Sequence, residues 1–295
     1  MCYAADSPSE TPGGACLSSA PADVYPRQHV RPSGIGLIAL LVASLAGGAY
    51  AALRAAPQEP ESDFRRLLER ERPSLKHPGG PREFYFTRGA YSSGWRWSSW
   101  ATDYPKADRQ FMLAVNSFID INAAEHENVV RLNDPEIRRY PFLYALEVGS
   151  MALTPSEVQG LRDYLLAGGF LVIDDFWGSW EWANFEREIR RVLPEFPIQE
   201  MPLDHPIFNA VYRIDEILQV PAIGNHWYGR TWERDGYMAH ARGIFDHDGR
   251  LMVIINWNTD LGDAWEWFER PEYPLNYSSF AVRMGINFIV YAMSH

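Results

Sequence analysis

Two adjacent aspartates, Asp174 and Asp175, stand at the end of a short apolar run and are the residues of this chain best placed to do chemistry. The run, residues 170–173, follows a helical pattern that stops at Gly168 and Gly169, and it predicts a buried, central parallel strand. Open α/β sheets bind their ligands at the carboxyl ends of such strands. We therefore expect one aspartate, with Asp175 the candidate catalytic residue, to contact a metal or a sugar or to act as a general base. Alternatively, one aspartate caps the next helix and the other pairs with an arginine.

Two histidines in polar loops, His205 and His226, could complete a site with Asp175. A hydrolase would use Asp175 and His205 as its catalytic residues, and a metal ion would need three or four nitrogen and oxygen ligands to converge. The chain has no HxH, HxxxH or HExxH spacing, so the sequence identifies no metal and we expect no cofactor. The alternative is that His205 hydrogen-bonds a backbone carbonyl in a structural turn.

The chain is rich in aromatic residues, with 11 Trp, 15 Tyr and 15 Phe, and several of them follow expected strands. In a doubly wound sheet those positions share the carboxyl edge, where rings stack on sugar faces and Arg or Asp side chains bind hydroxyl groups. We expect an aromatic-lined groove for a glycan or a peptide, or alternatively a hydrophobic lid that seals the edge. The expected ligand-binding residues are Arg88, Tyr91, Trp95, Asp174, Asp175, Trp177, His205, His226 and Trp257.

The N-terminal part of the chain predicts export. Residues 34–53 carry no charge and follow two arginines, a pattern typical of a transmembrane helix with its N-terminus inside, or of a cleaved signal peptide. We expect residues 1–33 to be a disordered extension, residues 54–81 a linker, and residues 82–295 a domain outside the cytoplasm. The expected location is the cell envelope: anchored in the inner membrane and facing the periplasm, or free in the periplasm after cleavage.

Composition argues against several functions. The net charge of −11 and the lack of any run of five Lys or Arg residues argue against nucleic-acid binding. Both cysteines, Cys2 and Cys16, precede the uncharged segment, so the exported part has no disulfide, no cysteine-ligated metal and no cysteine nucleophile. The partners that we expect are the membrane and a glycan, peptide or protein.

Alternating helical and strand patterns indicate an α/β fold. The expected strands are residues 82–88, 129–132, 141–148, 170–173 and 251–255, and the expected helices are residues 106–121, a segment that begins after Thr154, 181–193 and 279–292. Up to residue 173 the order is strand, helix, strand, strand, helix, strand. That order predicts a doubly wound, mostly parallel sheet between two layers of helices.

Five blocks of the chain carry a resemblance to a known family. They are FYFTRGAYSSGW at 84–95, YPFLYALEVGS at 140–150, LRDYLLAGGFLVIDDFWG at 161–178, DHPIFNAVYRI at 204–214 and MGINFIVYAM at 284–293. In this order they resemble the domain-of-unknown-function 4159 family, a branch of the class I glutamine amidotransferase-like superfamily. The resemblance implies a flavodoxin-like, three-layer α/β fold on exported or membrane-anchored bacterial proteins.

The resemblance also bears on activity. Amidotransferases of that superfamily present a cysteine nucleophile after this strand, whereas residues 174–178 contain no Cys and Ser179 lacks the flanking glycines of a nucleophile elbow. We therefore expect no glutamine hydrolysis, and instead a non-catalytic ligand-binding or scaffolding domain, exported and tethered to the membrane. One alternative is a metal- or carboxylate-dependent hydrolase that acts on a glycan or peptide. Another is a subunit of a membrane complex whose Trp-rich loops bind protein.

Overall fold

The computed structural model describes residues 84–94, 99–124 and 126–295. The expected extension, the uncharged segment, the linker and Trp95 lie outside these residues. Within the described part of the chain, no helix combines the length and the apolar character needed to span a bilayer.

A seven-stranded sheet in the order β2-β1-β3-β4-β7-β6-β5 forms the centre of the fold. The strands are β1 (Thr87–Ala90), β2 (Asn128–Arg131), β3 (Phe142–Leu146), β4 (Phe170–Asp174), β5 (Ile198–Glu200), β6 (His240–Phe245) and β7 (Leu251–Trp257). The pairs among β2, β1, β3, β4 and β7 are all parallel, whereas β6 is antiparallel to both of its neighbours. The predicted α/β fold with a mostly parallel sheet is therefore confirmed.

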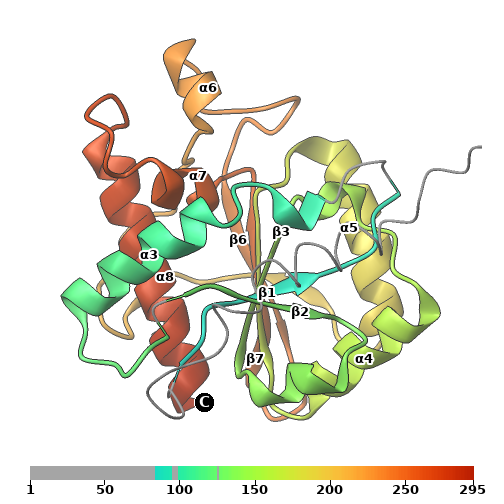
Figure 1. Cartoon of the computed structure of the whole chain (residues 1–295). Helices are drawn as coiled ribbons and strands as arrows, with labels where there is room; N and C mark the ends of the chain where they lie inside the picture. Colours follow the sequence, from blue (N-terminus) through green and yellow to red (C-terminus); the bar gives the residue numbers. More distant parts are fainter. Residues whose placement is uncertain (1–83, 95–98, 125) are drawn as a thin grey trace, which may run out of the picture. The chain divides into compact units, whose positions relative to one another are not determined.

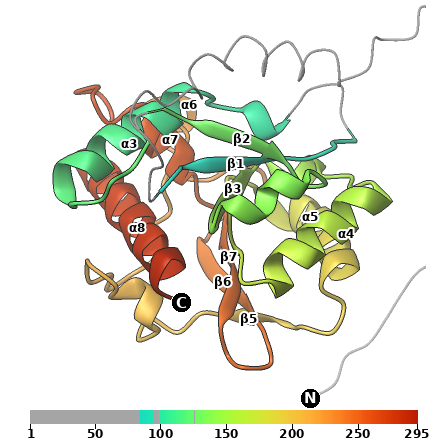
Figure 2. The ribbon, with the colours of Figure 1, turned by 60° about the horizontal axis from the view of Figure 1, so that its bottom comes forward.

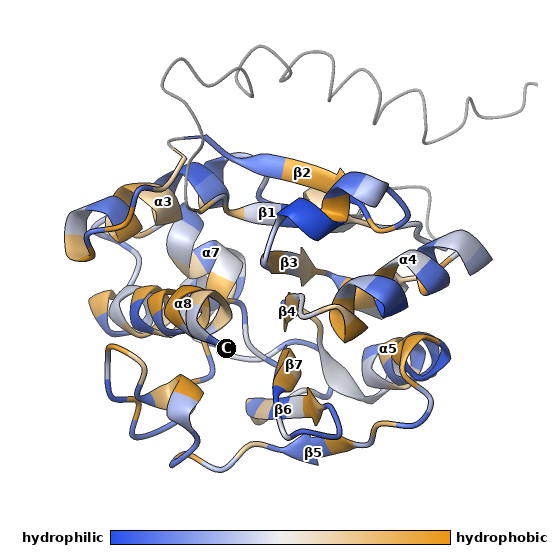
Figure 3. Ribbon diagram, turned by 90° about the horizontal axis from the view of Figure 1, so that it is seen from below, coloured by the Kyte–Doolittle hydropathy of each residue, from blue (hydrophilic) through white to orange (hydrophobic). Residues whose placement is uncertain are grey.

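Helices cover both faces of this sheet (Figures 1 and 3). One face carries α3 (Lys106–Phe118), α7 (Leu261–Glu266) and α8 (Leu275–Ser294), and the other carries α4 (Pro155–Leu166) and α5 (Gly178–Val192). Because α3 follows β1 on one face while α4 follows β3 on the other, the chain reverses its winding between β1 and β3. Ligand sites of doubly wound sheets form at such a switch point, beyond the carboxyl ends of the strands.

Each face has its own apolar core. Under α3, α7 and α8, the ring of Trp265 stacks on Phe111 at 4.3 Å between centroids. Under α4 and α5, Leu161, Phe185 and Ile189 pack on alternate residues of the same strands. Figure 3 shows the apolar character of β4 and β7, which are buried on both sides.

The segment that leads into β4 forms as its sequence predicts. The Thr154 side chain accepts a hydrogen bond from the Glu157 N–H, Glu157 binds back to the Thr154 N–H, and Pro155 begins the helix. The helix ends at Leu166 and is capped by Ala167, and the next residue, Gly168, has a φ of 108° that residues with a side chain rarely adopt. Strand β4 then lies between β3 and β7, both parallel to it, as a central strand.

Other elements depart from the prediction. Strand β1 covers Thr87–Ala90 and so continues two residues beyond the expected end at residue 88. Strand β6 was not predicted, because it has few apolar residues and is stabilised by pairing with β7 across a turn closed by Asp246. The short helices α6 (Ile223–Trp227) and α7 were also not predicted, since one or two turns give too few residues for a periodic pattern.

Candidate functional site

Asp174 is the last residue of β4 and its side chain points into the face covered by α7. Its Oδ2 accepts hydrogen bonds from the Tyr144 hydroxyl at 2.7 Å and from the backbone N–H groups of Leu261 and Gly262 at 3.0 and 3.1 Å. Asp174 thus binds the free amides at the start of α7, not those of α5, the next helix in the chain. Its Oδ1 is buried and has no hydrogen-bond partner within the described residues, and burial raises the pKa of Asp174 to about 7.

Asp175 turns away from its neighbour and faces the carboxyl edge. Its backbone has a left-handed φ of 46°. The Asp175 N–H donates a hydrogen bond to the Thr259 carbonyl at 3.2 Å, and the Asp175 carbonyl accepts one from the Glu147 N–H at 2.9 Å. The Asp175 Oδ1 accepts a hydrogen bond from the Trp177 indole at 2.9 Å. The two aspartates therefore have different surroundings, and only Asp175 joins other carboxylates at the edge.

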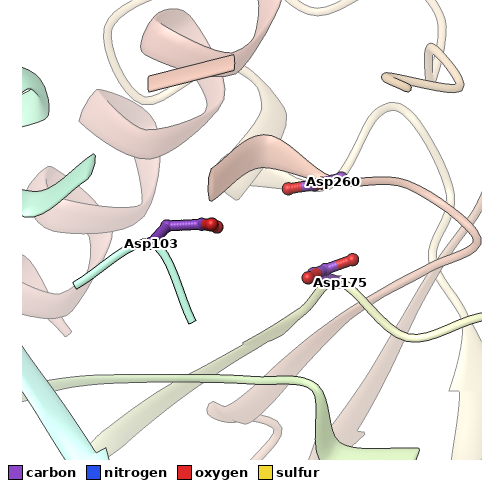
Figure 4. Close-up of side chains that lie close together, drawn as sticks. All are labelled: Asp103, Asp175 and Asp260. Atoms are coloured by element: carbon purple, nitrogen blue, oxygen red, sulfur yellow. The ribbon is translucent and has the colours of Figure 1, made fainter. Parts of the chain in front are cut away.

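Three aspartates from separate loops converge at this point. One carboxylate oxygen from each of Asp103, Asp175 and Asp260 lies within 4.8 Å of the other two, and the side chains point toward one another (Figure 4). We call these three residues the aspartate cluster. Asp103 comes from the turn before α3, and Asp260 precedes α7, where it accepts a hydrogen bond from the Asp263 N–H at 2.7 Å. A second group that meets the same distance limit, Asp103, Asp263 and Glu266, shares Asp103 with the first.

The cluster is strongly acidic and largely withdrawn from water. Asp175 is 6% exposed and Asp260 is 3% exposed. Burial, followed by the charge of Glu147, raises the pKa of Asp175 well above its usual range. Burial, followed by the charge of Asp175, raises the pKa of Asp260. Burial, followed by the charge of Asp263, raises the pKa of Asp103. These shifts have a common cause, since each carboxylate loses hydration and faces other negative charges.

Glu147 borders the cluster at the end of β3. Burial, then repulsion from Glu181 and Glu233, raises its pKa to about 7. Arg234 partly offsets this repulsion and forms an ion pair with Glu181. Glu147 is thus an acid that titrates near neutral pH beside the cluster.

The donor set of the aspartate cluster suits a hard divalent cation. All three groups are carboxylates, and neither acidic group within the described residues includes a histidine. Oxygen ligands of this kind are those that Mg²⁺, Ca²⁺ and Mn²⁺ prefer. The Asp103 Oδ2 is buried and no described residue donates a hydrogen bond to it. A side chain at position 262 would place a Cβ atom 3.1 Å from this oxygen, so Gly262 leaves room for it.

The N-terminus of α5, beside the cluster, has its amides occupied. The Trp177 N–H donates to Glu181, the Gly178 N–H donates to Asn258 Oδ1 at 2.8 Å, and the Ser179 N–H donates to Asp235 Oδ1 at 2.9 Å. A Cβ atom on residue 178 would lie 2.1 Å from Asp235 Oδ1. The turn is therefore filled by the chain's own side chains and has no free amide among these three to bind an oxyanion.

Several residues that the sequence assigned to a ligand groove are committed to the interior. Arg88 is 1% exposed, forms an ion pair with Asp108 at 2.6 Å, and donates to the carbonyls of Trp100 and Thr102 at 3.0 and 2.5 Å. Its guanidinium thus holds the loop that carries Asp103. Tyr91 is also buried, and its hydroxyl donates to the Leu146 carbonyl at 2.6 Å.

Two tryptophans from the same set pack on the α5 side. Trp177 is buried beside Asp175. Trp257, the last residue of β7, stacks on His240 at 5.1 Å and lies 4.8 Å from Trp182 between ring centroids. The guanidinium of Arg242 lies 4.6 Å from the Trp257 ring. Both residues thus form part of the packing next to the edge.

The structure separates the candidate histidines from Asp175. His205 lies near Tyr291, whose hydroxyl contacts the N–H of Leu251, the first residue of β7. His205 is therefore at the amino edge of the sheet, opposite Asp175, and its Nδ1 accepts a hydrogen bond from the Ile207 N–H at 3.2 Å. His205 therefore has the role expected of a structural turn residue, although its ring accepts from a backbone N–H group and does not donate to a carbonyl.

His226 lies in α6, where its ring is 6.3 Å from that of Tyr273. Neither acidic group includes it. The structure thus does not bring Asp175, His205 and His226 together as a shared ligand set.

Sequence reasoning missed Asp103, Glu147, Asp260 and Asp263. A signal existed for Asp260 and Asp263, because they follow the predicted 251–255 strand as Asp175 follows β4. The sequence around Asp103 carries no such signal, because the position of Asp103 at the edge depends on the hydrogen bonds from Arg88 to the preceding loop.

A family model matches most of the described domain. The model of the family described as domain of unknown function (DUF4159) matches residues 90–293. No curated protein matched the chain. The matched range includes β1 from its last residue, all the other strands, and each member of the aspartate cluster.

Proposed function

The chain belongs to the DUF4159 family, and from this premise we propose that its described domain is a ligand-binding module whose aspartate cluster holds a divalent cation. The cation then contacts an oxygen-rich ligand at the carboxyl edge of the sheet. As the sequence suggests, the module is exported, tethered to the membrane by residues 34–53 unless they are cleaved, and located in the cell envelope.

The observation that carries this proposal is the state of the aspartate oxygens. Three carboxylates lie within 4.8 Å of one another, and the buried Asp103 Oδ2 receives no hydrogen bond from any described residue. Ionised carboxylates at this separation and burial repel each other strongly. Protons or a cation must offset that repulsion, and a divalent cation does so at neutral pH while supplying the missing partner to Asp103.

Exposed aromatic side chains support a glycan as the ligand. Trp227, the last residue of α6, is 66% exposed, and Tyr228 and Tyr237, between α6 and β6, are 80% and 69% exposed. This segment also contains Glu233, which raises the pKa of Glu147 through its charge, and Asp235, which binds the start of α5. The segment therefore reaches the same edge as the cluster. Aromatic rings stack on sugar faces, while a cation binds sugar hydroxyls or carboxylates.

The amidotransferase relationship is proposed at the level of fold only. The order β2-β1-β3-β4-β7 of the parallel strands corresponds to the flavodoxin-like order, which supports placement in that superfamily. The filled N-terminus of α5 and the lack of a cysteine after residue 16 both argue against glutamine hydrolysis. A family member of this kind keeps the sheet and uses the strand ends differently.

A second candidate function is a cation-dependent hydrolase. Glu147, with a pKa of about 7, is partly ionised near neutral pH, and its carboxylate would serve as a general base beside the cluster. A bound cation would supply Lewis-acid activation of water. Asp175 would then be a cation ligand, and His205 would take no part because it lies at the opposite edge. A glycan or peptide would be the substrate.

A purely protein-binding role in a membrane complex would use the exposed aromatic segment and need no cation.

Equilibrium dialysis of the full-length chain against Mg²⁺, Mn²⁺ and Ca²⁺, followed by metal analysis, tests the proposal. We expect bound cation in wild type and none in Asp175→Asn, with Asp120→Asn, an exposed aspartate after α3, as the matched control. Oligosaccharides and cell-wall peptides are then tested with the cation and with chelator. Ligand binding that needs the cation supports a binding module, and release of shorter products supports the hydrolase. If wild type binds no cation, the proposed function is wrong.

A further inference from the structure

A hollow distinct from the aspartate cluster is lined mainly by residues of α3 and α8. It has a volume of about 550 Å³, within the size range of small-molecule sites, and is lined by residues of both helices together with Tyr212 and Phe268. Figure 2 shows α3 and α8 on the same face of the sheet. None of the residues that line this groove belongs to the aspartate cluster or to the second acidic group.

The walls of the groove are mainly apolar and open to solvent. Leu113 and Phe118 on α3 are each 62% exposed, and Leu275 at the start of α8 is 77% exposed. Ala114 and Val282 are buried and line the same groove. Large apolar side chains gathered at one hollow indicate a contact surface for an apolar molecule, because scattered exposure alone would not bring them together.

One buried polar group in the groove lacks a partner. Ser278 is 4% exposed and lines the groove, yet its Oγ forms no hydrogen bond with any described residue. Buried hydroxyl groups in folded proteins nearly always have a hydrogen-bond partner. An oxygen of a bound molecule would supply that partner.

A positive charge completes the set. Arg283 is exposed, lines the groove, and makes no ion pair with an acid in the described part of the chain. In a chain of net charge −11, a guanidinium without a carboxylate partner beside an apolar hollow suits an anionic head group.

We propose that the groove between α3 and α8 binds a single-chain anionic amphiphile, either a fatty acid or a monoacyl phospholipid. The acyl chain packs against Leu113, Ala114 and Val282, and the carboxylate or phosphate pairs with Arg283. Ser278 hydrogen-bonds an oxygen of the ligand. The site is independent of the cation site, so either can fail without affecting the other.

Photo-crosslinking of the full-length chain with a diazirine-bearing palmitate tests this site. We expect labelled peptides from α3 and α8, and loss of the label when unlabelled ligand competes. Competition by palmitate and by monoacyl phosphatidate, run separately, shows which head group is preferred. The methyl ester of palmitate lacks the negative charge and should compete at least 10-fold less well.

Two variants and a matched control decide the result. Ala114→Phe fills the groove and should reduce labelling at least 10-fold, and Arg283→Glu, at an exposed position where folding is not at risk, should reduce it about 10-fold. Arg187→Glu makes the same charge change on α5, across the sheet, and should leave labelling unchanged. Labelling spread over the whole surface, or unaffected by Arg283→Glu, would overturn the proposal.

Discussion

Two neighbouring regions at the carboxyl edge of the sheet differ in how their polar groups are satisfied. At the N-terminus of α5, the amides of residues 177–179 each have a side-chain acceptor: Glu181 of the same helix, and Asn258 and Asp235 from distant segments. In the aspartate cluster, carboxylates crowd together and Asp103 Oδ2 has no donor among the described residues. The first region is complete within the chain, whereas the second needs protons or a cation from outside.

The largest expected effect is the loss of cation affinity when two carboxylates of the cluster are removed. In Asp175→Asn/Asp260→Asn, we expect cation affinity to fall at least 1,000-fold, or about 4 kcal/mol, because two of three charged ligands are lost. With chelator present, the variant should melt at or above the wild-type temperature, since the mutual repulsion of the acids is also removed. Titration calorimetry with Mn²⁺ and thermal melting measure the two quantities. An unchanged affinity would show that the cation binds elsewhere.

The pH dependence of stability gives the next largest effect. When chelator keeps the site free of cation, burial raises the pKa of Glu147 to about 7 from an ordinary value of 4.5. The folded state therefore binds this proton more tightly than the unfolded chain. The contribution of protonated Glu147 to the free energy of unfolding is fully present below about pH 4 and is lost as the pH rises through 7, a change on the order of 3 kcal/mol. Asp174, with a pKa of about 7, acts in the same direction.

Denaturant unfolding between pH 4.5 and 8 checks this sign. Stability should fall as the pH rises in chelator, and Glu147→Gln should flatten part of that slope. A saturating divalent cation should flatten it further, because cation binding favours the ionised acids. A slope of the opposite sign would contradict the protonated state that we assign to the apo site.

A smaller effect is expected at the start of α5. Asn258 binds the Gly178 N–H with its Oδ1 and the Met238 carbonyl with its Nδ2, and its φ of 60° is one that glycine adopts without strain. Asn258→Gly should lower the free energy of unfolding by about 2 kcal/mol, because the buried Gly178 N–H and the partly buried Met238 carbonyl lose their partners. Cation affinity should change less than threefold. A larger loss of affinity would mean that the two regions are not separate.

The smallest effect should come from Asp235, the exposed cap of the same helix. Its carboxylate accepts hydrogen bonds from the N–H and the hydroxyl of Ser179, both of which water can replace. Asp235→Ala should therefore cost about 0.5–1 kcal/mol of stability and leave cation binding unchanged. Chemical denaturation beside Asp235→Asn, which keeps an acceptor oxygen, separates the cap from the charge.

The same comparison shows what the sequence could predict. The strand at 170–173, its flanking helix and the position of Asp175 follow from local signals: the Thr154 cap, the glycine stop and an apolar run. The rest of the site does not, since Asp103 and Asp260 lie 72 and 85 residues from Asp175 and meet it only after the sheet forms. Residue type also misled us for Arg88, whose guanidinium binds Asp108 and the interior carbonyls.

His205 illustrates why loop residues are hard to place. The segment 204–214 forms a turn against the C-terminal half of α8, where Asn287 accepts from the N–H groups of Val211 and Tyr212 at 3.0 and 2.8 Å. These contacts hold the loop at the amino edge. No spacing in the sequence distinguishes that edge from the carboxyl edge, so a loop histidine could be assigned to either.

Anomalous diffraction from a crystal of the protein soaked in Mn²⁺ tests the central claim most directly. We predict a peak bounded by the carboxylates of Asp103, Asp175 and Asp260, with metal–oxygen distances of about 2.1–2.3 Å. The amides of residues 177–179 should keep the acceptors described above. A map with no peak at the cluster, and carboxylates that hydrogen-bond to one another through shared protons, would contradict the account.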